Sequence, residues 1–105
     1  MKQIVVYKNR TNVVSVSLGF DVSNDVITSD IRTHKDRTSQ LIASWLVSFV
    51  TDGVDGELLL TLDDSVTSTI TKGTGYMDIK RISGGEPLNL FDEVLEVIFR
   101  NTVTV

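Results

Sequence analysis

The residues of this chain that could carry out acid–base or nucleophilic chemistry are few, and their spacing does not assemble a catalytic site. His34 is the single histidine among 105 residues, so a serine triad, a histidine zinc site or a general-base pair would have to use it. It lies in a polar segment with Thr33, Lys35 and Asp36, and no second catalytic group stands at a recognisable spacing from it. We therefore interpret His34 as a solvated loop residue and expect the chain not to be an enzyme.

Clustered carboxylates raise the question of a metal site. Residues 52–57 (DGVDGE) supply oxygen ligands and two glycines, but the spacing of a calcium loop is absent, and a glycine hairpin turn explains the pattern better. The neighbouring pairs Asp63-Asp64 and Asp92-Glu93 point in different directions on a strand or turn, as caps and solvated edges do. The chain has no cysteine, which excludes disulfides and cysteine-ligated zinc. We expect no metal and no cofactor.

Asp78 is the acid with the most informative position, because it falls inside the predicted strand 76–81. We expect that strand to be largely buried, and a buried carboxylate needs partners. Lys80, Arg81 or Arg32 could supply them. We favour a pairing that sets the sheet register over a ligand site.

Charge and hydropathy exclude several classes of partner. The formal net charge is −4, and the basic residues alternate with acidic or polar ones, so we expect no nucleic-acid partner. Ser83-Gly84-Gly85-Glu86 lacks the Lys-Ser/Thr of a phosphate-binding loop. No apolar stretch approaches the roughly 18 residues of a membrane span, and residues 1–7 are too short for a secretion signal. We expect a protein made and used without secretion or membrane contact.

The elements that would position these residues are strands. Val, Ile and Thr make up 15, 8 and 12 of the residues, and such β-branched side chains suit a pleated sheet. Alternation of apolar and polar residues predicts inward faces such as Ile27 and Ile31, and the longest run places Trp45 in the core, more than about nine-tenths buried. The predicted strands are 14–20, 26–32, 41–49, 57–62, 76–81 and 94–99.

Residues 52–81 predict how two sheets are joined. The segment begins with a glycine turn and the strand 57–62. A helical turn follows, capped by Asp63 or Asp64 and bearing Val66 and Ile70 on one side, and then a second strand. Met77 and Ile79, or Tyr76 and Asp78, would face inward in that second strand. The fold class is therefore all-β: one domain, residues 1–105, forming a two-sheet antiparallel β-sandwich of seven to eight strands with one short helical turn.

Two segments are candidate contacts with a partner. Ile4, Val5, Val6 and Tyr7 form an unbroken apolar run, and a strand that is apolar on both faces needs cover on both faces. The loop 33–40 is polar and has no hydrophobic anchor, so its order must come from hydrogen bonds or from a partner. Lys35 and Arg37 would then meet an acidic surface, whereas the simpler interpretation is a solvated hairpin tip.

The turns and alternating strands together resemble a known family. The residues that carry the resemblance are the strand Ile27–Arg32, the strand through Trp45, the Asp-Gly turns before Leu58, the segment Gly75–Ile79 and the terminal Val94–Val105. From about Val14 onward the chain resembles the small immunoglobulin-like β-sandwich domains of tailed-bacteriophage structural modules, which occur alone or at the N-terminus of upper baseplate proteins. That resemblance implies a docking role without catalysis, and the family has no active-site motif to carry over.

The resemblance implies a virion structural protein of a tailed bacteriophage, assembled in the host cytoplasm. It would dock in the tail, baseplate or fibre-attachment region, through sheet edges and loops, onto other virion proteins or further copies in a symmetric assembly. A capsid decoration protein is the first alternative. A carbohydrate- or receptor-binding module is the second, although aromatic residues make up only 7% of the chain and fall mostly at inward positions.

Overall fold

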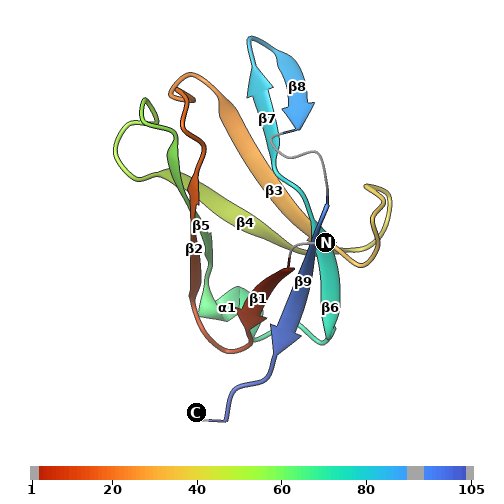
Figure 1. Cartoon of the computed structure of the whole chain (residues 1–105). Coiled ribbons are helices and arrows are strands. Elements are labelled where there is room, and N and C mark those ends of the chain that lie inside the picture. Colours follow the sequence, from red (N-terminus) through yellow and green to blue (C-terminus); the bar gives the residue numbers. More distant parts are fainter. Residues whose placement is uncertain (1–2, 90–93, 104–105) are drawn as a thin grey trace.

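Strands dominate the computed structural model, which describes residues 3–89 and 94–103 (Figure 1). Nine strands are described, against seven to eight expected, with one short helix, so the all-β prediction is confirmed. In chain order the elements are β1 (Gln3–Tyr7), β2 (Asn12–Ser17), β3 (Val26–Arg32), β4 (Leu41–Phe49), β5 (Glu57–Leu62), α1 (Asp64–Thr67), β6 (Thr74–Met77), β7 (Lys80–Ser83), β8 (Glu86–Asn89) and β9 (Leu95–Arg100).

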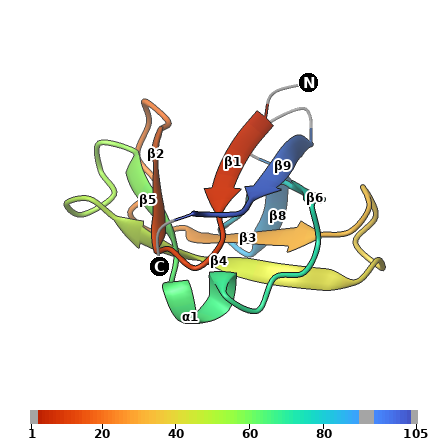
Figure 2. The same cartoon turned by 90° about the horizontal axis from the view of Figure 1, so that it is seen from below.

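Strand β4 joins the two layers of the fold. The strands follow one path, β1-β9-β6-β3-β4-β5-β2, and the β7–β8 hairpin pairs with β3. The first half of β4, up to Trp45, pairs with β3, and its second half, from Leu46 on, pairs with β5. Figure 2 shows β2 and β5 on one side of the molecule and β6 on the other. The arrangement is an immunoglobulin-like β-sandwich whose sheets remain connected through β4.

One pair of strands departs from the expected antiparallel arrangement. β1 runs parallel to β9, with Gln3 opposite Glu96 and Tyr7 opposite Arg100. The two strands are far apart in the sequence, so no hairpin dictates their relative direction. The Gln3 side-chain amide donates a 2.6 Å hydrogen bond to the Glu96 carboxylate across this pair.

The core agrees closely with the predicted inward faces. Trp45 is only 5% exposed, which confirms its place in the core, and its indole Nε1 is buried without a hydrogen-bond partner. Phe20 and Leu41 are partly exposed instead, because Phe20 lies beyond the end of β2 and Leu41 is the first residue of β4. The buried apolar residues are Val6, Val22, Ile27, Ile31, Ala43, Trp45, Leu58, Leu60, Leu62, Ile70, Met77, Ile79, Leu95, Val97 and Phe99.

The predicted strand 76–81 is interrupted at Asp78 and Ile79. β6 and β7 nevertheless keep one register against β3, with Met77 opposite Ile31 and Lys80 opposite Thr28. At the interruption the hydroxyl of Ser29 donates a 2.7 Å hydrogen bond to the Asp78 carbonyl. Met77 and Ile79 are the buried residues of this segment, which decides between the two registers left open by the sequence.

Residues 83–87, expected to form only a turn, continue into strand β8. Ser83 pairs with Glu86, so Gly84 and Gly85 form a two-residue hairpin turn, and both have positive φ (58° and 83°). Positive φ at both central residues is the geometry of a type I′ turn, which glycine adopts without strain. Pro87 then lies in β8, which pairs only with β7 among the described strands, and an edge strand tolerates proline.

The corner between the two sheets forms as predicted, with one correction. Asp63 is the N-cap of α1, and its side chain accepts a hydrogen bond from the Asp64 N–H. The helix ends at Thr67, which is fully buried, and Ile70 beyond it is buried too. Val66 is partly exposed, because the helix ends before Val66 and Ile70 can lie on one helical face.

Candidate docking surface

An open groove of about 620 Å³ lies on the outer face of β3 and β6. The loop 33–40, which projects from the right of Figure 1, forms one wall, and the β7–β8 hairpin at the top of that view contributes to the other. The floor is polar because the outward residues of β3 are polar while Ile27, Ser29 and Ile31 point into the core. The described residues that line it are Thr28, Asp30, Arg32, His34, Lys35, Asp36, Arg37, Tyr76, Met77, Asp78, Lys80, Pro87, Leu88 and Val94.

Internal hydrogen bonds order the loop 33–40. The Thr33 N–H donates to the Gln40 carbonyl at 3.0 Å, and the Ser39 hydroxyl donates to the Asp36 carbonyl at 2.6 Å. The Asp36 carboxylate accepts the Thr38 N–H, which holds the pKa of Asp36 below its ordinary value. Of the two sources of order expected from the sequence, hydrogen bonds are therefore present within the chain itself.

The groove carries more positive charge than the rest of the chain. Four basic and three acidic side chains line it, whereas the whole chain has a formal net charge of −4. Arg32 is partly neutralised, because its Nη2 lies 3.5 Å from the Asp30 carboxylate, and its Nη1 donates to the Ser39 carbonyl. Lys35 stands over the Tyr76 ring, with Nζ 5.5 Å from the ring centroid, and it remains exposed. Lys35 and Arg37 therefore give this wall exposed positive charge in a chain of net negative charge.

The prediction that Asp78 is buried is wrong. Asp78 is exposed and lines the groove, because Met77 and Ile79 take the inward positions. The common register places it across from Asp30 on β3, and carboxylates directly opposite each other repel. Arg81, one of the partners proposed for Asp78, instead lies with Nε 2.7 Å from the Asp25 carboxylate. That Nε–H makes no hydrogen bond, so the contact is an ion pair without a directed hydrogen bond.

The structure separates the two segments proposed as partner contacts. Lys35 and Arg37 are exposed and line the groove, whereas no described residue of β1 does so. Val6 is fully buried in the core and is not a surface residue. Ile4 and Val5 are half-buried and Tyr7 is exposed, so an interface role for these three stays a prediction.

His34 is exposed in the loop, and its Nδ1 lies 3.0 Å from the Thr33 hydroxyl. It lines the groove together with Asp36 and Asp78, without a hydrogen bond to either carboxylate among the described contacts. The arrangement offers charge and hydrogen bonding to a partner. The hydroxyl of Thr33 is the described hydrogen-bond partner of the imidazole.

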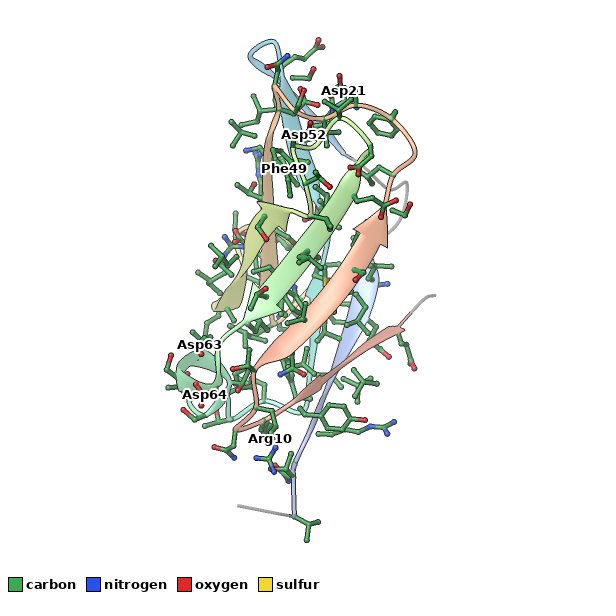
Figure 3. The ribbon with its side chains drawn as sticks, turned by 90° about the vertical axis from the view of Figure 1, so that its left-hand side faces the viewer. Arg10, Asp21, Phe49, Asp52, Asp63 and Asp64 are labelled. Carbon is green, nitrogen blue, oxygen red and sulfur yellow. The ribbon has the colours of Figure 1, made fainter. Side chains whose placement is uncertain are left out.

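The described carboxylate clusters, 52–57 and Asp63-Asp64, bond to the backbone around them, whereas Asp92-Glu93 lies outside the described residues. Asp52 accepts the Val54 N–H and Asp55 accepts the Glu57 N–H, both at 3.0 Å, which confirms the turn interpretation of this segment. Figure 3 shows Asp21 and Asp52 at one end of the β2–β5 layer, with Asp63 and Asp64 at the other. Within residues 3–89 and 94–103 no group of three carboxylate or histidine side chains is arranged to hold a metal ion.

The second wall of the groove was not predicted from the sequence. Lys80, Pro87 and Leu88 come from the β7–β8 hairpin, and the signal for it was the Gly84-Gly85 pair between two short alternating segments. Tyr76 was considered only as a possible core residue. Its outward position follows from the register of β6 against β3, which the sequence left open.

Comparisons with known proteins add little to this picture. No known protein family matches the chain, and no curated protein matches its sequence. Among solved structures the chain is similar to one from a study of the multimeric cell-adhesive interactions of VGSC beta subunits. The identity is 8% and the TM-score 0.42, over 96% of this chain and 91% of that one. Separately, none of the described helices has the length and apolar character needed to cross a bilayer.

Proposed function

We propose that this chain is a non-catalytic structural protein of a tailed-phage virion, which docks in the tail, baseplate or fibre-attachment region. The phage context is supported by the resemblance of the segments from Ile27 to Val105 described above. The docking role is supported by one observation in particular, the basic-rimmed groove between loop 33–40 and the β7–β8 hairpin.

The groove suits an extended acidic segment of another virion protein. Lys35 and Arg37 supply exposed positive charge on one side, and Pro87, Leu88 and Val94 supply apolar surface for side chains between the acidic residues. The loop is already held by its own hydrogen bonds, so a partner does not have to order it on binding. Charge attraction of this kind speeds association and selects the partner more than it raises affinity.

The test is incorporation of a double variant into particles of the phage that encodes the chain. Lys35→Glu with Arg37→Glu is expected to weaken incorporation of the protein into particles about tenfold at low salt. The effect is expected to vanish near 1 M salt because the charges are exposed and screened. Lys72→Glu with Arg100→Glu is the matched control, since both residues are exposed and neither lines the groove. Full incorporation of the Lys35→Glu, Arg37→Glu variant at low salt would contradict the docking role of the groove.

Fractionation of the particles tests the location. The proposal expects the protein in purified tails. Its presence in capsids alone would favour the decoration role instead, and its absence from particles altogether would overturn the proposed function.

A further inference from the structure

Three described strands have an open edge: one carries charge and proline, and one has the backbone of its last residue bonded by a side chain. The path of the sheet ends at β1 and at β2, and β8 forms the outer strand of its hairpin. β8 carries Glu86 and Pro87, and charge and proline both discourage pairing with a further strand. In β1 the backbone of the last residue, Tyr7, is hydrogen-bonded by the side chain of Asn12 from β2. The Asn12 amide accepts the Tyr7 N–H and donates to the Tyr7 carbonyl, both at 2.9 Å.

β2 has neither feature. Its sequence, Asn-Val-Val-Ser-Val-Ser, contains no charged residue and no proline over six residues. The Leu18 N–H donates to the Gly56 carbonyl just beyond the strand, and hydrogen bonding alternates along an antiparallel pair. Asn12, Val14 and Val16 therefore bond toward β5, and the backbone groups of Val13, Ser15 and Ser17 face away from it. No described strand accepts them.

The sheet face beside this edge is also nearly free of charge. Val13, Thr61 and Leu46 form one row across β2, β5 and β4, and Val13 and Leu46 are 57% and 70% exposed. Ser15, Leu59 and Ser48 form the next row. In the third row Ser17 donates a 2.6 Å hydrogen bond to the single acid, Glu57. β2 and β5 lie toward the viewer in Figure 3.

We propose that β2 pairs antiparallel with β2 of a second copy of this chain, about a two-fold axis beside Ser15. This register is the one in which the outward backbone groups meet: Ser15 lies opposite Ser15 of the second copy, and Val13 lies opposite Ser17 of the second copy. A two-fold interface brings each residue near its own equivalent, so a charged edge would repel itself. β2 carries no charge along its whole length, so two copies of it do not repel each other. The strand also has no charge that would select an oppositely charged protein instead.

The inference rests on the proposed function in that it names one partner of a docking protein, namely another copy. It uses a different face from the groove, because no residue of β2 or β5 is among the described lining residues. A dimer joined through β2 would therefore leave two grooves open to other proteins. Pairing through one six-residue strand is a small interface, so we expect a concentration-dependent dimer.

Cysteine cross-linking tests the register directly, because the chain has no cysteine of its own. In Ser15→Cys the two thiols would be carried by opposite residues of a hydrogen-bonded pair, about 5.5 Å apart at Cα, which is within disulfide range. Mild oxidation is expected to give a covalent dimer. A mixture of Val13→Cys and Ser17→Cys is expected to cross-link to each other more than either does to itself.

Ser48→Cys is the matched control, since it makes the same change in the same row of the sheet, two strands away. Equal cross-linking of Ser15→Cys and Ser48→Cys would overturn the proposal, and so would a native chain that stays monomeric in sedimentation velocity at high concentration. Cross-linking of Ser15→Cys to a different protein in particles would overturn the second copy as the occupant.

Ser15→Lys provides a test without oxidation. It would place two lysines opposite each other and is expected to weaken dimerisation at least tenfold, while Ser48→Lys leaves it unchanged. A dimer that survives Ser15→Lys contradicts the proposal. The two proposals fail separately: a monomer found in tails overturns the dimer alone, and a dimer absent from particles overturns the proposed function alone.

Discussion

The hydroxyl of Thr67 and the backbone of Arg10 form a reciprocal pair of hydrogen bonds that ties helix α1 to the turn between β1 and β2. Thr67 Oγ1 donates to the Arg10 carbonyl at 2.7 Å and accepts the Arg10 N–H at 3.1 Å. The side chain is fully buried. Thr67 therefore attaches the corner between the sheets to the N-terminal part of the chain. Nothing in the sequence distinguishes it among the twelve threonines.

Replacing this threonine separates its hydroxyl from its shape. Thr67→Val keeps the volume but loses both hydrogen bonds in a buried setting, and we expect it to lower the free energy of unfolding by about 1–3 kcal/mol. Thr67→Ser keeps the hydroxyl and loses one methyl group, at about 1 kcal/mol. Urea denaturation of the two variants makes the comparison. A valine variant more stable than the serine variant would contradict the role given to the hydroxyl.

Trp45 is the single tryptophan and reports on the core by itself. We expect a blue-shifted fluorescence maximum in the native protein, and an emission like that of indole in water would contradict its burial. Trp45→Ala is expected to cost about 3–5 kcal/mol because it leaves a large cavity. Trp45→Phe is expected to cost clearly less, since it refills most of the space and removes an Nε1–H that has no partner.

Two glycines with different surroundings make a matched pair of backbone tests. Gly56 has φ of +74°, and a Cβ there would meet the backbone of Phe20. Gly56→Ala combines left-handed strain with a clash and is expected to cost at least about 2 kcal/mol. Gly73→Ala meets nothing within 4 Å and is expected to change stability by less than about 1 kcal/mol. Thermal unfolding distinguishes them, and equal melting temperatures would contradict the assigned geometry.

The helix cap predicts a specific response to acid. The Ser65 hydroxyl, followed by hydrogen bonds from Asp64 and Thr11, holds the pKa of Asp63 below its ordinary value. A carboxyl with a depressed folded-state pKa stabilises the protein above its unfolded pKa, near 4, and this contribution is lost as pH falls through the folded value. Asp63→Asn is therefore expected to be less stable than the native chain at pH 7. The difference should shrink below about pH 4, and a constant difference down to pH 2 would contradict the cap.

Local sequence patterns predicted the elements whose structure depends on neighbours along the chain. The bounds of β3, β4 and β5 coincide with the predicted strands 26–32, 41–49 and 57–62, because alternation and glycine turns are encoded locally. Asp63 as an N-cap follows from the same kind of signal. Burial of Trp45 follows from its place in the longest alternating run.

Features that depend on distant pairing were not predictable in this way. The exposure of Asp78 is set by the register of β6 against β3, and a shift of one residue reverses every side chain of a strand. The parallel direction of β1 follows from its pairing with a strand at the far end of the sequence. The groove needs loop 33–40 and the β7–β8 hairpin to flank one sheet face, which neither segment indicates alone.

The parallel pairing of β1 with β9 also determines how the domain bears a mechanical load. The N-terminal end of β1 and the C-terminal end of β9 lie at opposite ends of this pair, as the arrows in Figure 1 show. Tension between Gln3 and Arg100 therefore acts along the strands, and all the hydrogen bonds that join them are loaded in shear at once. A hairpin pulled from its open end breaks one bond after another. This domain would instead resist extension up to a single high rupture force and then yield abruptly.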